Sequence, residues 1–301
     1  MMSAWTSGTL CKEQTVENLE NWAQRTADDL LARSIVGPGI CLFLGAADTG
    51  KTSVAAALAD RLSCRRPVAF VDADVGQSHI GPPAAVGCAI LDKPCPDLTA
   101  IVPEAIAFVG DVSPVGHLLQ FAAALARCLA AVGPKADITL IDTPGLVSGG
   151  AAAALWWTVH RIVRQAGIIA LERQNELETV LAGLDRFDAH IERIHTPAAL
   201  GVKTPEQRRQ YRMRRFADYF RQATPQPLNL AEVAIQSGRN MNHGGCVNRL
   251  VALMDKANAE IALGLIKTWD ANKKRATVLT PTTDLSTVRC IVVGDLTIEE
   301  Q

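Results

Sequence analysis

The stretch Gly45-Ala-Ala-Asp-Thr-Gly-Lys51-Thr52 decides how the fold of this chain is interpreted. It follows the apolar run Ile40-Cys-Leu-Phe-Leu44 and opens a segment of helical character at 51–62. A glycine-containing turn between a buried strand and a helix is the context in which GxxxxGK[ST] forms a phosphate-binding loop. The glycines let main-chain N–H groups curl around phosphate oxygens, and the helix N-terminus adds a favourable partial charge.

The residue types in this loop predict distinct roles. Lys51 should reach the β- and γ-phosphates of a nucleotide, and the Thr52 hydroxyl should coordinate Mg²⁺. We therefore expect ATP and Mg²⁺ as cofactors. The residues expected to bind them are Gly45, Asp48, Thr49, Gly50, Lys51, Thr52 and Ser53.

Short apolar runs alternate with longer helical segments in the first two thirds of the chain. Strands are expected at 40–44, 68–71, 106–109, 138–141 and 167–171, and helices at 16–33, 51–62 and 114–132. This alternation predicts an α/β class, namely a P-loop NTPase fold with a parallel sheet flanked by helices. Functional groups should then gather where strands end, at Gly45, Asp72, Gly110 and Asp142.

The sequence changes character after His195. We expect an N-terminal helical lead-in at 1–38, a P-loop domain at 39–224 that includes a basic segment at 203–221, and a small C-terminal β-rich domain at 225–301. In this last domain, β-like runs are expected at 262–266, 276–279 and 288–293, and a short helix near 247–254.

Composition excludes several classes of protein. With 30 basic and 31 acidic residues, a net charge of −1, the chain cannot coat nucleic acid through bulk charge, so a local patch must bind any polyanion. Eight cysteines without a CxxC pair indicate reduced thiols and no zinc site. We find no signal peptide and expect no membrane span, so a cytoplasmic location is expected. The sequence indicates no particular protein partner.

A second acidic motif, Asp72-Ala-Asp74-Val-Gly76-Gln77, ends the strand at 68–71. One of these two carboxylates can hold magnesium through water, and the other can accept a proton from an attacking hydroxyl. Both can serve one site only if the chain turns after Asp72, which Gly76 permits.

The motif Asp142-Thr-Pro-Gly145 allows two interpretations. A DxxG sequence after a strand is also typical of the switch of a GTPase. Such proteins carry a guanine-reading NKxD or TKxD motif, and this sequence has neither. Guanine specificity is therefore not supported, but a regulatory NTPase switch stays open.

Between Lys203 and Arg221 the chain has seven basic and only two acidic residues, a local charge of +5. Arg208, Arg212 and Arg215 share one helical face, where like charges repel one another. Such a stripe indicates a missing anion, and arginines on a transferring phosphoryl group can raise the rate by about 10³–10⁵. The alternative is a solvated basic face.

Taken in order, these motifs resemble the polynucleotide 5′-hydroxyl kinase family, whose eukaryotic members act in tRNA splicing, mRNA 3′-end formation and rRNA processing. The resemblance covers the chain from Gly39 to Ile298. The family pattern G-x-x-D-x-G-K-[ST] occurs at Gly45–Thr52, and the pattern D-x-D-x-G-Q occurs at Asp72–Gln77. The pattern G-x-x-S-P occurs at Gly110–Pro114. The family's lid, R-x-x-x-R followed by Tyr-Phe, is matched by Arg208, Arg212 and Tyr219–Phe220.

The resemblance implies that Asp74 acts on an acceptor hydroxyl and that Arg208 and Arg212 close over the γ-phosphate. Asp72 is then expected to hold the metal together with Thr52. The resemblance further implies acceptor-positioning residues, which are Gln77, Thr143, Pro144 and Gly145. Two departures stand out. The family's T-P-G-W has Leu146 in place of the tryptophan, and only a short helix precedes the core, as in a compact prokaryotic-type form.

We therefore expect an ATP-dependent kinase that phosphorylates the 5′-hydroxyl end of RNA or DNA, with Lys51, Asp74, Arg208 and Arg212 as catalytic residues. The first alternative is a regulatory P-loop switch or assembly module that has no acceptor. The second is a small-molecule kinase with a closed acceptor pocket.

Overall fold

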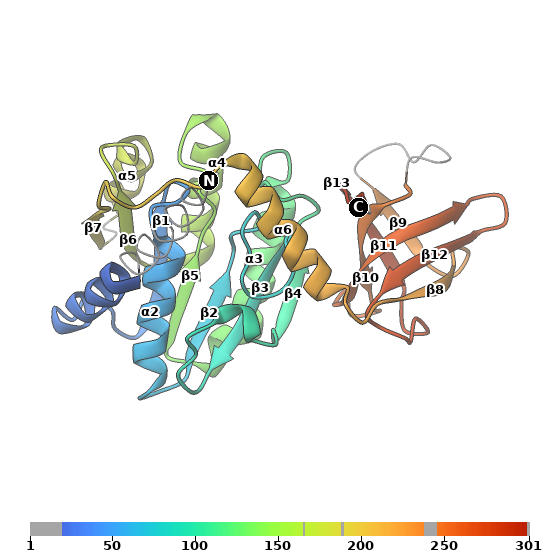
Figure 1. Cartoon of the computed structure of the whole chain (residues 1–301), viewed down its shortest axis with the longest axis horizontal. Helices are drawn as coiled ribbons and strands as arrows, with labels where there is room; N and C mark the ends of the chain where they lie inside the picture. The colour runs from blue at the N-terminus through green and yellow to red at the C-terminus, as the bar shows by residue number, and fades with distance from the viewer. Residues whose placement is uncertain (1–19, 165, 188–189, 238–245, 300–301) are drawn as a thin grey trace, which may run out of the picture.

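A computed structural model of the chain describes residues 20–164, 166–187, 190–237 and 246–299. Figure 1 shows two parts side by side, an α/β part built on a seven-stranded sheet and a β part built on a six-stranded sheet. Helix α6 (Pro205–Tyr219) extends from the first part to the second.

The first sheet has the strand order β4-β3-β2-β5-β1-β6-β7. Strands β2, β5, β1, β6 and β7 pair in parallel, whereas β3 is antiparallel to both β2 and β4. Strand β4 therefore points the same way as β2, which brings the ends of β1, β2, β4 and β5 to one edge. The bounds are β1 Gly39–Gly45, β2 Val68–Asp72, β3 Ala85–Leu91, β4 Ala105–Phe108, β5 Ile138–Asp142, β6 Gly167–Glu172 and β7 Ile191–His195.

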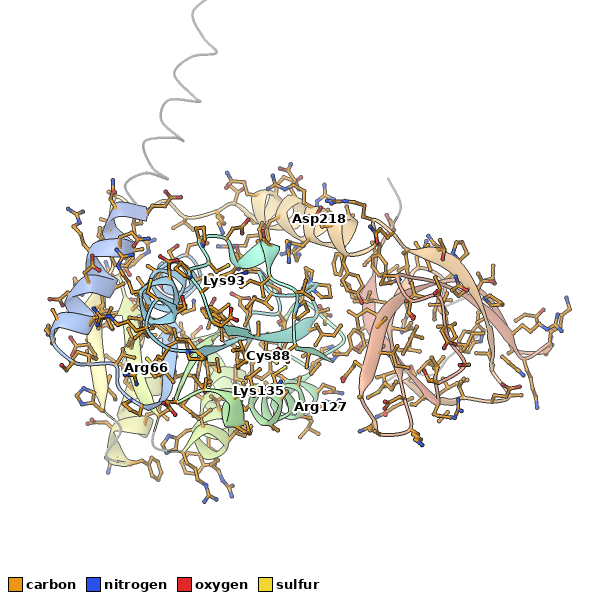
Figure 2. The ribbon with its side chains drawn as sticks, turned by 90° about the horizontal axis from the view of Figure 1, so that it is seen from below. Arg66, Cys88, Lys93, Arg127, Lys135 and Asp218 are labelled. Atoms are coloured by element: carbon orange, nitrogen blue, oxygen red, sulfur yellow. The ribbon has the colours of Figure 1, made fainter. Side chains whose placement is uncertain are left out.

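Helices cover both faces of this sheet. One face buries its apolar side chains against α3 (Leu118–Val132), α4 (Gly149–Val163) and α5 (Glu178–Leu184). The other face packs against α2 (Lys51–Ser63) and a helix at residues 20–32. Figure 2 shows Arg127 and Lys135, on and just beyond α3, on the opposite side of the sheet from Asp218 on α6. Short 3₁₀ turns lie at Leu98–Ala100, Gly133–Lys135 and Asp185–Phe187.

Several element boundaries differ from the sequence expectations. Strand β3 was not expected, and α3 begins at Leu118 and not at Pro114, because Gly116 takes a left-handed φ of 84° just before it. Residues 16–19 of the expected first helix lie outside the described residues. The stretch Leu118–Lys135 is apolar and long enough to cross a membrane by length and composition. Its helix packs against β3 and β4, which accounts for the apolar face.

The second sheet has the order β8-β12-β11-β10-β13-β9, in which only β9 and β13 pair in parallel. The β-rich C-terminal domain is thereby confirmed, but the helix expected near 247–254 is wrong, because this segment forms the central strand β10. The bounds are β8 Thr224–Asn229, β9 Ala234–Ser237, β10 Arg249–Met254, β11 Glu260–Asp270, β12 Arg275–Thr280 and β13 Cys290–Thr297.

The two sheets share an apolar cluster. Phe108 of β4 and Phe216 of α6 pack with Leu250, Leu263 and neighbouring residues of the second sheet. A separate cluster lies within the β part, on the other face of β10. The α/β part and the β part are therefore joined through buried contacts as well as through the chain.

Candidate active site at the carboxyl edge of the first sheet

The phosphate loop begins where β1 meets β6. A Cβ atom on Gly45 would lie 2.4 Å from the Leu171 carbonyl oxygen and 2.6 Å from Thr49 Oγ1, so this close approach requires glycine. Asp48 and Gly50 take left-handed φ angles of 61° and 88°, which turn the chain sharply before α2. The expected loop therefore forms between a buried strand and a helix.

Lys51 is only 5% exposed and lies within this loop. Its ammonium donates a hydrogen bond of 2.9 Å to the Ala46 carbonyl. An ammonium group that lies close to the main-chain N–H groups of a loop at a helix N-terminus forms a binding site for a polyphosphate. Ser53 is half-buried in the first turn of α2, and its role as a cofactor ligand stays a prediction.

An arginine that the sequence did not single out supports this loop. Arg173 follows β6 and donates from Nη2 to the main-chain oxygens of Asp48 (2.8 Å) and Leu200 (3.0 Å). The Thr196 hydroxyl, just after β7, donates to the Thr49 carbonyl at 2.9 Å. These residues come from distant parts of the sequence, and no motif signals them.

The Thr52 hydroxyl meets the carboxylate of Asp142 at the end of β5. Thr52 Oγ1 donates to Asp142 Oδ2 at 2.5 Å, while the buried Oδ1 of Asp142 has no hydrogen-bond partner among the described residues. Burial raises the pKa of Asp142, and the charge of Lys51 opposes this. Hydroxyl and carboxylate oxygens are the ligands that Mg²⁺ prefers, so this pair fits a magnesium ion.

Asp72, to which we assigned a metal role, has different contacts. Its carboxylate accepts hydrogen bonds from the main-chain N–H groups of Asp74, His79 and Ile80 and from the Ser78 hydroxyl. Burial and the neighbouring charge of Asp142 raise the pKa of Asp72. These bonds fix the loop after β2. The structure thus brings Asp142, not Asp72, onto Thr52, and a metal role for Asp72 stays a prediction.

Asp74 is half-buried within this loop, beside the phosphate loop. Its Oδ1 accepts from the main-chain N–H groups of Gly76 (3.0 Å) and Gln77 (3.1 Å). No hydrogen bond to its Oδ2 occurs in the part of the chain that the structure describes. Asp72 and Asp142 are register partners at the ends of β2 and β5, so Asp74, two residues after Asp72, follows the strand end that lies beside Asp142.

The N-terminal end of α6 is anchored to the phosphate loop. Thr204 and Gln207 form a capping box that starts the helix. Arg208 Nη2 donates to Asp48 Oδ2 at 2.5 Å, and the Lys203 main-chain N–H donates to the same oxygen at 3.0 Å. The expected arginine segment therefore reaches the nucleotide side of the site.

Further along, α6 lies against the loop that carries Asp74. Lys203 Nζ donates to Gln77 Oε1 at 2.7 Å, the Tyr211 hydroxyl donates to the Ser78 carbonyl at 3.0 Å, and Arg215 Nη2 donates to the His79 carbonyl at 2.6 Å. The Tyr211 hydroxyl is therefore held by the loop that carries Asp74. Arg215 is occupied by main-chain oxygens.

Arg212 differs from the other two arginines on this face. Among the residues that the structure covers, its guanidinium has no hydrogen bond or ion pair. Burial, followed by the charge of Arg208, lowers the pKa of Arg212, whereas Asp111 and Asp74 act in the opposite direction. A half-buried guanidinium without a partner is available to an incoming phosphoryl group.

The motif Thr143-Pro144-Gly145 packs on the phosphate loop. The Thr143 hydroxyl donates to the Phe43 carbonyl at 2.5 Å, and a Cβ on Gly145 would lie 2.5 Å from the Ala47 nitrogen. Leu146, in place of the family's tryptophan, packs against the core, and its carbonyl accepts from Trp156 Nε1 at 2.7 Å. The predicted acceptor role of Gln77, Thr143, Pro144 and Gly145 stays a prediction.

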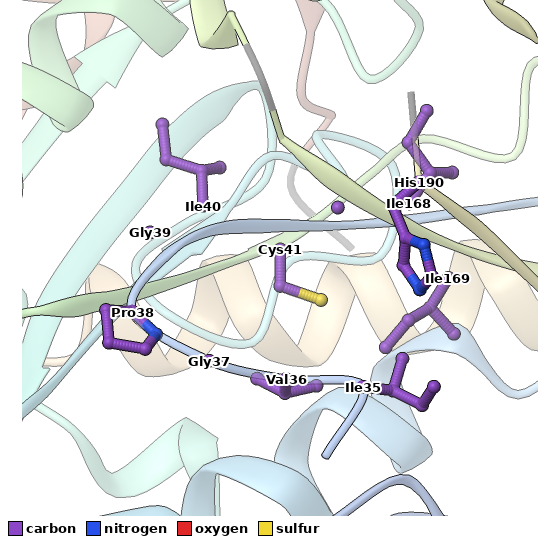
Figure 3. Close-up of a pocket in the computed structure, with 11 residues that line it drawn as sticks. Ile35, Val36, Gly37, Pro38, Gly39, Ile40, Cys41, Ile168, Ile169 and His190 are labelled. Carbon is purple, nitrogen blue, oxygen red and sulfur yellow. The ribbon is translucent and has the colours of Figure 1, made fainter. Parts of the chain in front are cut away.

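A separate pocket lies at the other end of β1, lined by residues 35–41 and 167–169 and by His190. Figure 3 shows the Cys41 side chain at its centre. Because the phosphate loop follows the carboxyl end of β1, this pocket belongs to the opposite edge of the sheet.

Comparison with known proteins bears on both the fold and the site. Residues 45–222 match the family model of the P-loop region of the mRNA cleavage and polyadenylation factor CLP1. The polyribonucleotide 5′-hydroxyl-kinase of Pyrococcus furiosus is 25% identical over 89% of this chain and 90% of its own length. That of Pyrococcus abyssi is 26% identical over 91% and 92%.

A solved structure of a Clp1p–Pcf11p complex contains a chain of the same fold. It superposes with a TM-score of 0.69 at 11% sequence identity, covering 95% of this chain and 80% of the other. The matched region of the family model includes the phosphate loop, the acidic loop and α6, which are the three elements that meet in the structure.

Proposed function

The chain belongs to the CLP1 P-loop family, and on that premise we propose that it is an ATP-dependent polynucleotide 5′-hydroxyl kinase. It transfers the γ-phosphate of ATP to the 5′-hydroxyl end of a nucleic acid. The observation that carries the proposal is the contact between the phosphate loop and the end of β5, where Thr52 Oγ1 donates to Asp142 Oδ2. The loop of the candidate base Asp74 begins at Asp72, the register partner of Asp142. The full-length archaeal relatives that carry this name support it.

On the nucleotide side, the chain binds and orients the triphosphate. The main-chain N–H groups of the phosphate loop and the Lys51 ammonium hold the phosphate oxygens. Thr52 and Asp142 would hold Mg²⁺, which supplies charge neutralisation at the β- and γ-phosphates. Arg173 and Thr196 keep the loop in shape from β6 and β7.

On the acceptor side, Asp74 acts on the 5′-hydroxyl. Its Oδ1 is fixed by two main-chain donors, so the carboxylate is held in one orientation. Its Oδ2 is available to accept the hydroxyl proton as the oxygen attacks phosphorus. A positioned carboxylate within reach of the attacking group is the arrangement that phosphoryl transfer requires.

Two of the arginines of α6, Arg212 and Arg208, have different roles. Arg212 is available to bind the equatorial oxygens of the transferring group, where charge is spread in the transition state. Arg208 holds α6 on the phosphate loop through Asp48. Because the relatives are named as acting on polyribonucleotides, we propose RNA as the preferred acceptor.

Label transfer from γ-labelled ATP to oligonucleotides is the direct test. The purified chain should label 5′-hydroxyl RNA, with DNA as the comparison, and should not label the same oligonucleotides that carry a 5′-phosphate. Absence of transfer to RNA and DNA by a folded protein in the presence of Mg²⁺ would contradict the proposal.

The packing of Gly145 on Ala47 favours a second candidate, a regulatory NTPase whose 142–145 loop senses the γ-phosphate. Hydrolysis of ATP at a rate that oligonucleotides do not change, without phosphorylated product, would support that reading instead.

A further inference from the structure

Strand β13 of the second sheet meets the loop after β4 through main-chain hydrogen bonds. The Gly110 carbonyl accepts hydrogen bonds from the main-chain N–H groups of Asp295 (2.9 Å) and Leu296 (3.2 Å). A Cβ on Gly294 would lie 2.6 Å from the Gly110 oxygen and 2.8 Å from Phe108 Cζ. The contact therefore requires glycine at position 294.

The same loop, residues 110–117, touches the loop that carries the candidate base. A Cβ on Gly76 would lie 2.9 Å from the Val112 carbonyl oxygen. The Gly76 main-chain N–H in turn donates to Asp74 Oδ1 at 3.0 Å. Direct contacts thus run from β13, through the 110–117 loop, to the carboxylate of Asp74.

Side chains make a second connection between the same parts. His117 is 12% exposed, and its Nε2 lies 3.5 Å from Asp295 Oδ2 on β13 and 3.9 Å from Asp111 Oδ2. The side chains of Asp295, His117 and Asp111 therefore connect β13 of the second sheet to the 110–117 loop.

The C-terminal end of α6 is also held by the second sheet. The Tyr219 hydroxyl accepts from the Leu263 main-chain N–H at 2.8 Å, and Phe216 is buried in the shared cluster. The phosphate loop differs, because Arg173 and Thr196, which support it, follow strands of the first sheet.

We propose that the second β domain is a positioning element of the acceptor side, on the basis of the kinase function proposed above. Strand β13 holds the 110–117 loop against the loop of Asp74. This contact determines where the 5′-end of the nucleic acid lies relative to the γ-phosphate of ATP. Gly294 and His117 are positioning residues in this arrangement, and neither touches the reacting atoms.

The test compares two glycine substitutions within the same domain. In Gly294→Ala the new methyl group must push the 110–117 loop, and a misplacement of about 1 Å can lower a rate by about 10²-fold. In Gly264→Ala the methyl group would lie 2.3 Å from Val278 Cγ1, within the second sheet and away from the loop. Both variants of the full chain are assayed for kcat and for the KM of ATP and of a 5′-hydroxyl RNA.

For Gly294→Ala we expect kcat/KM for RNA to fall about 10- to 100-fold, with the KM for ATP within about twofold of wild type. For Gly264→Ala we expect a lower melting temperature with an unchanged KM for RNA. His117→Ala inserts no atoms into the interface, and it should raise the KM for RNA while the KM for ATP stays within about twofold of wild type. This variant provides the test if Gly294→Ala does not fold.

Normal RNA kinetics in His117→Ala and Gly294→Ala, or equal losses in Gly294→Ala and Gly264→Ala, would overturn the inference and leave the kinase function standing. A wild-type protein that labels no oligonucleotide would overturn the kinase function and the inference with it.

Discussion

The phosphate loop from Gly45 to Thr52 makes its polar contacts with itself, with residues that end strands of the first sheet and, through Asp48, with the start of α6. Across the site, Asp74 Oδ2 and the Arg212 guanidinium have no hydrogen-bond partner among the described residues. The loop is already shaped for its ligand, because main-chain geometry and close glycine contacts determine it. The acceptor side is assembled from separate segments that meet only in the folded chain. We therefore expect different substitutions to affect ATP binding and phosphoryl transfer to the acceptor.

The largest effect is expected from Lys51→Ala on the nucleotide side. Loss of the ammonium removes a charge from the β- and γ-phosphates, so transfer should fall by about 10³-fold or more. Label transfer measures the loss of rate, and calorimetry with an ATP analogue measures the loss of nucleotide affinity. The melting temperature should stay near wild type, and Lys93→Ala, an exposed lysine after β3, should be fully active. Unchanged ATP binding in Lys51→Ala would contradict the assignment.

Asp74→Asn should separate the two sides most clearly. The amide cannot accept the hydroxyl proton, so kcat should fall by about 10²- to 10³-fold while the KM for ATP stays unchanged. Steady-state kinetics with each substrate varied in turn measure this. Asp92→Asn removes an exposed carboxylate from the loop after β3 and should leave kcat at the wild-type value. A full rate in Asp74→Asn would exclude this residue as the base.

Metal dependence should distinguish the two buried aspartates. Chelation should abolish transfer, and Asp142→Asn should lower activity about 10- to 100-fold and raise the Mg²⁺ concentration that is needed. Asp72→Asn should instead lower the free energy of unfolding by about 1–3 kcal/mol, because it disturbs the donors of the 74–81 loop. Activity titrated with Mg²⁺, together with urea unfolding, measures both. If Asp72→Asn raises the Mg²⁺ requirement and Asp142→Asn does not, Asp72 is the metal ligand.

The smallest effect is expected from Asp48→Asn. This substitution removes the charge of the buried Asp48 side chain, but the Asn oxygen can still accept hydrogen bonds from Arg208, whose side chain is 27% exposed, and from the Lys203 main-chain N–H, so the loss should be about 1 kcal/mol. The KM for ATP should change about threefold to fivefold, with the acceptor KM unchanged. A larger change in the acceptor KM would mean that the two sides are coupled through α6.

The phosphate loop could be predicted from sequence because its residues are contiguous and their local geometry follows from glycine and helix-start chemistry. The metal partner of Thr52 could not. Both Asp72 and Asp142 end a buried strand, and only the strand order shows that β5 lies beside β1 while β2 lies one strand further away. That order depends on tertiary packing, which no local pattern records.

The second sheet shows a different limit. Leu250 and Ala252 pack on the shared cluster, whereas Val251 and Leu253 pack on the cluster within the β part. Because both faces of β10 are buried, its apolar run has no alternation, and periodicity cannot distinguish a strand from a buried helix. The spacing predicted that Arg208, Arg212 and Arg215 share one face of α6. Their partners could not be predicted, because Arg208 pairs with Asp48 and Arg215 donates to main-chain carbonyls that are distant in sequence.

The shared cluster around Phe216 has a consequence for how the protein melts. A fragment that ends at residue 224 would expose Phe108, Phe216 and Tyr219 to water, because their partners lie on β10 and β11. Burying large side chains of this kind contributes several kcal/mol in total, which is comparable to the stability of a whole domain. We therefore expect the two sheets to unfold in one cooperative transition, so that the catalytic half has no independent thermal stability to retain.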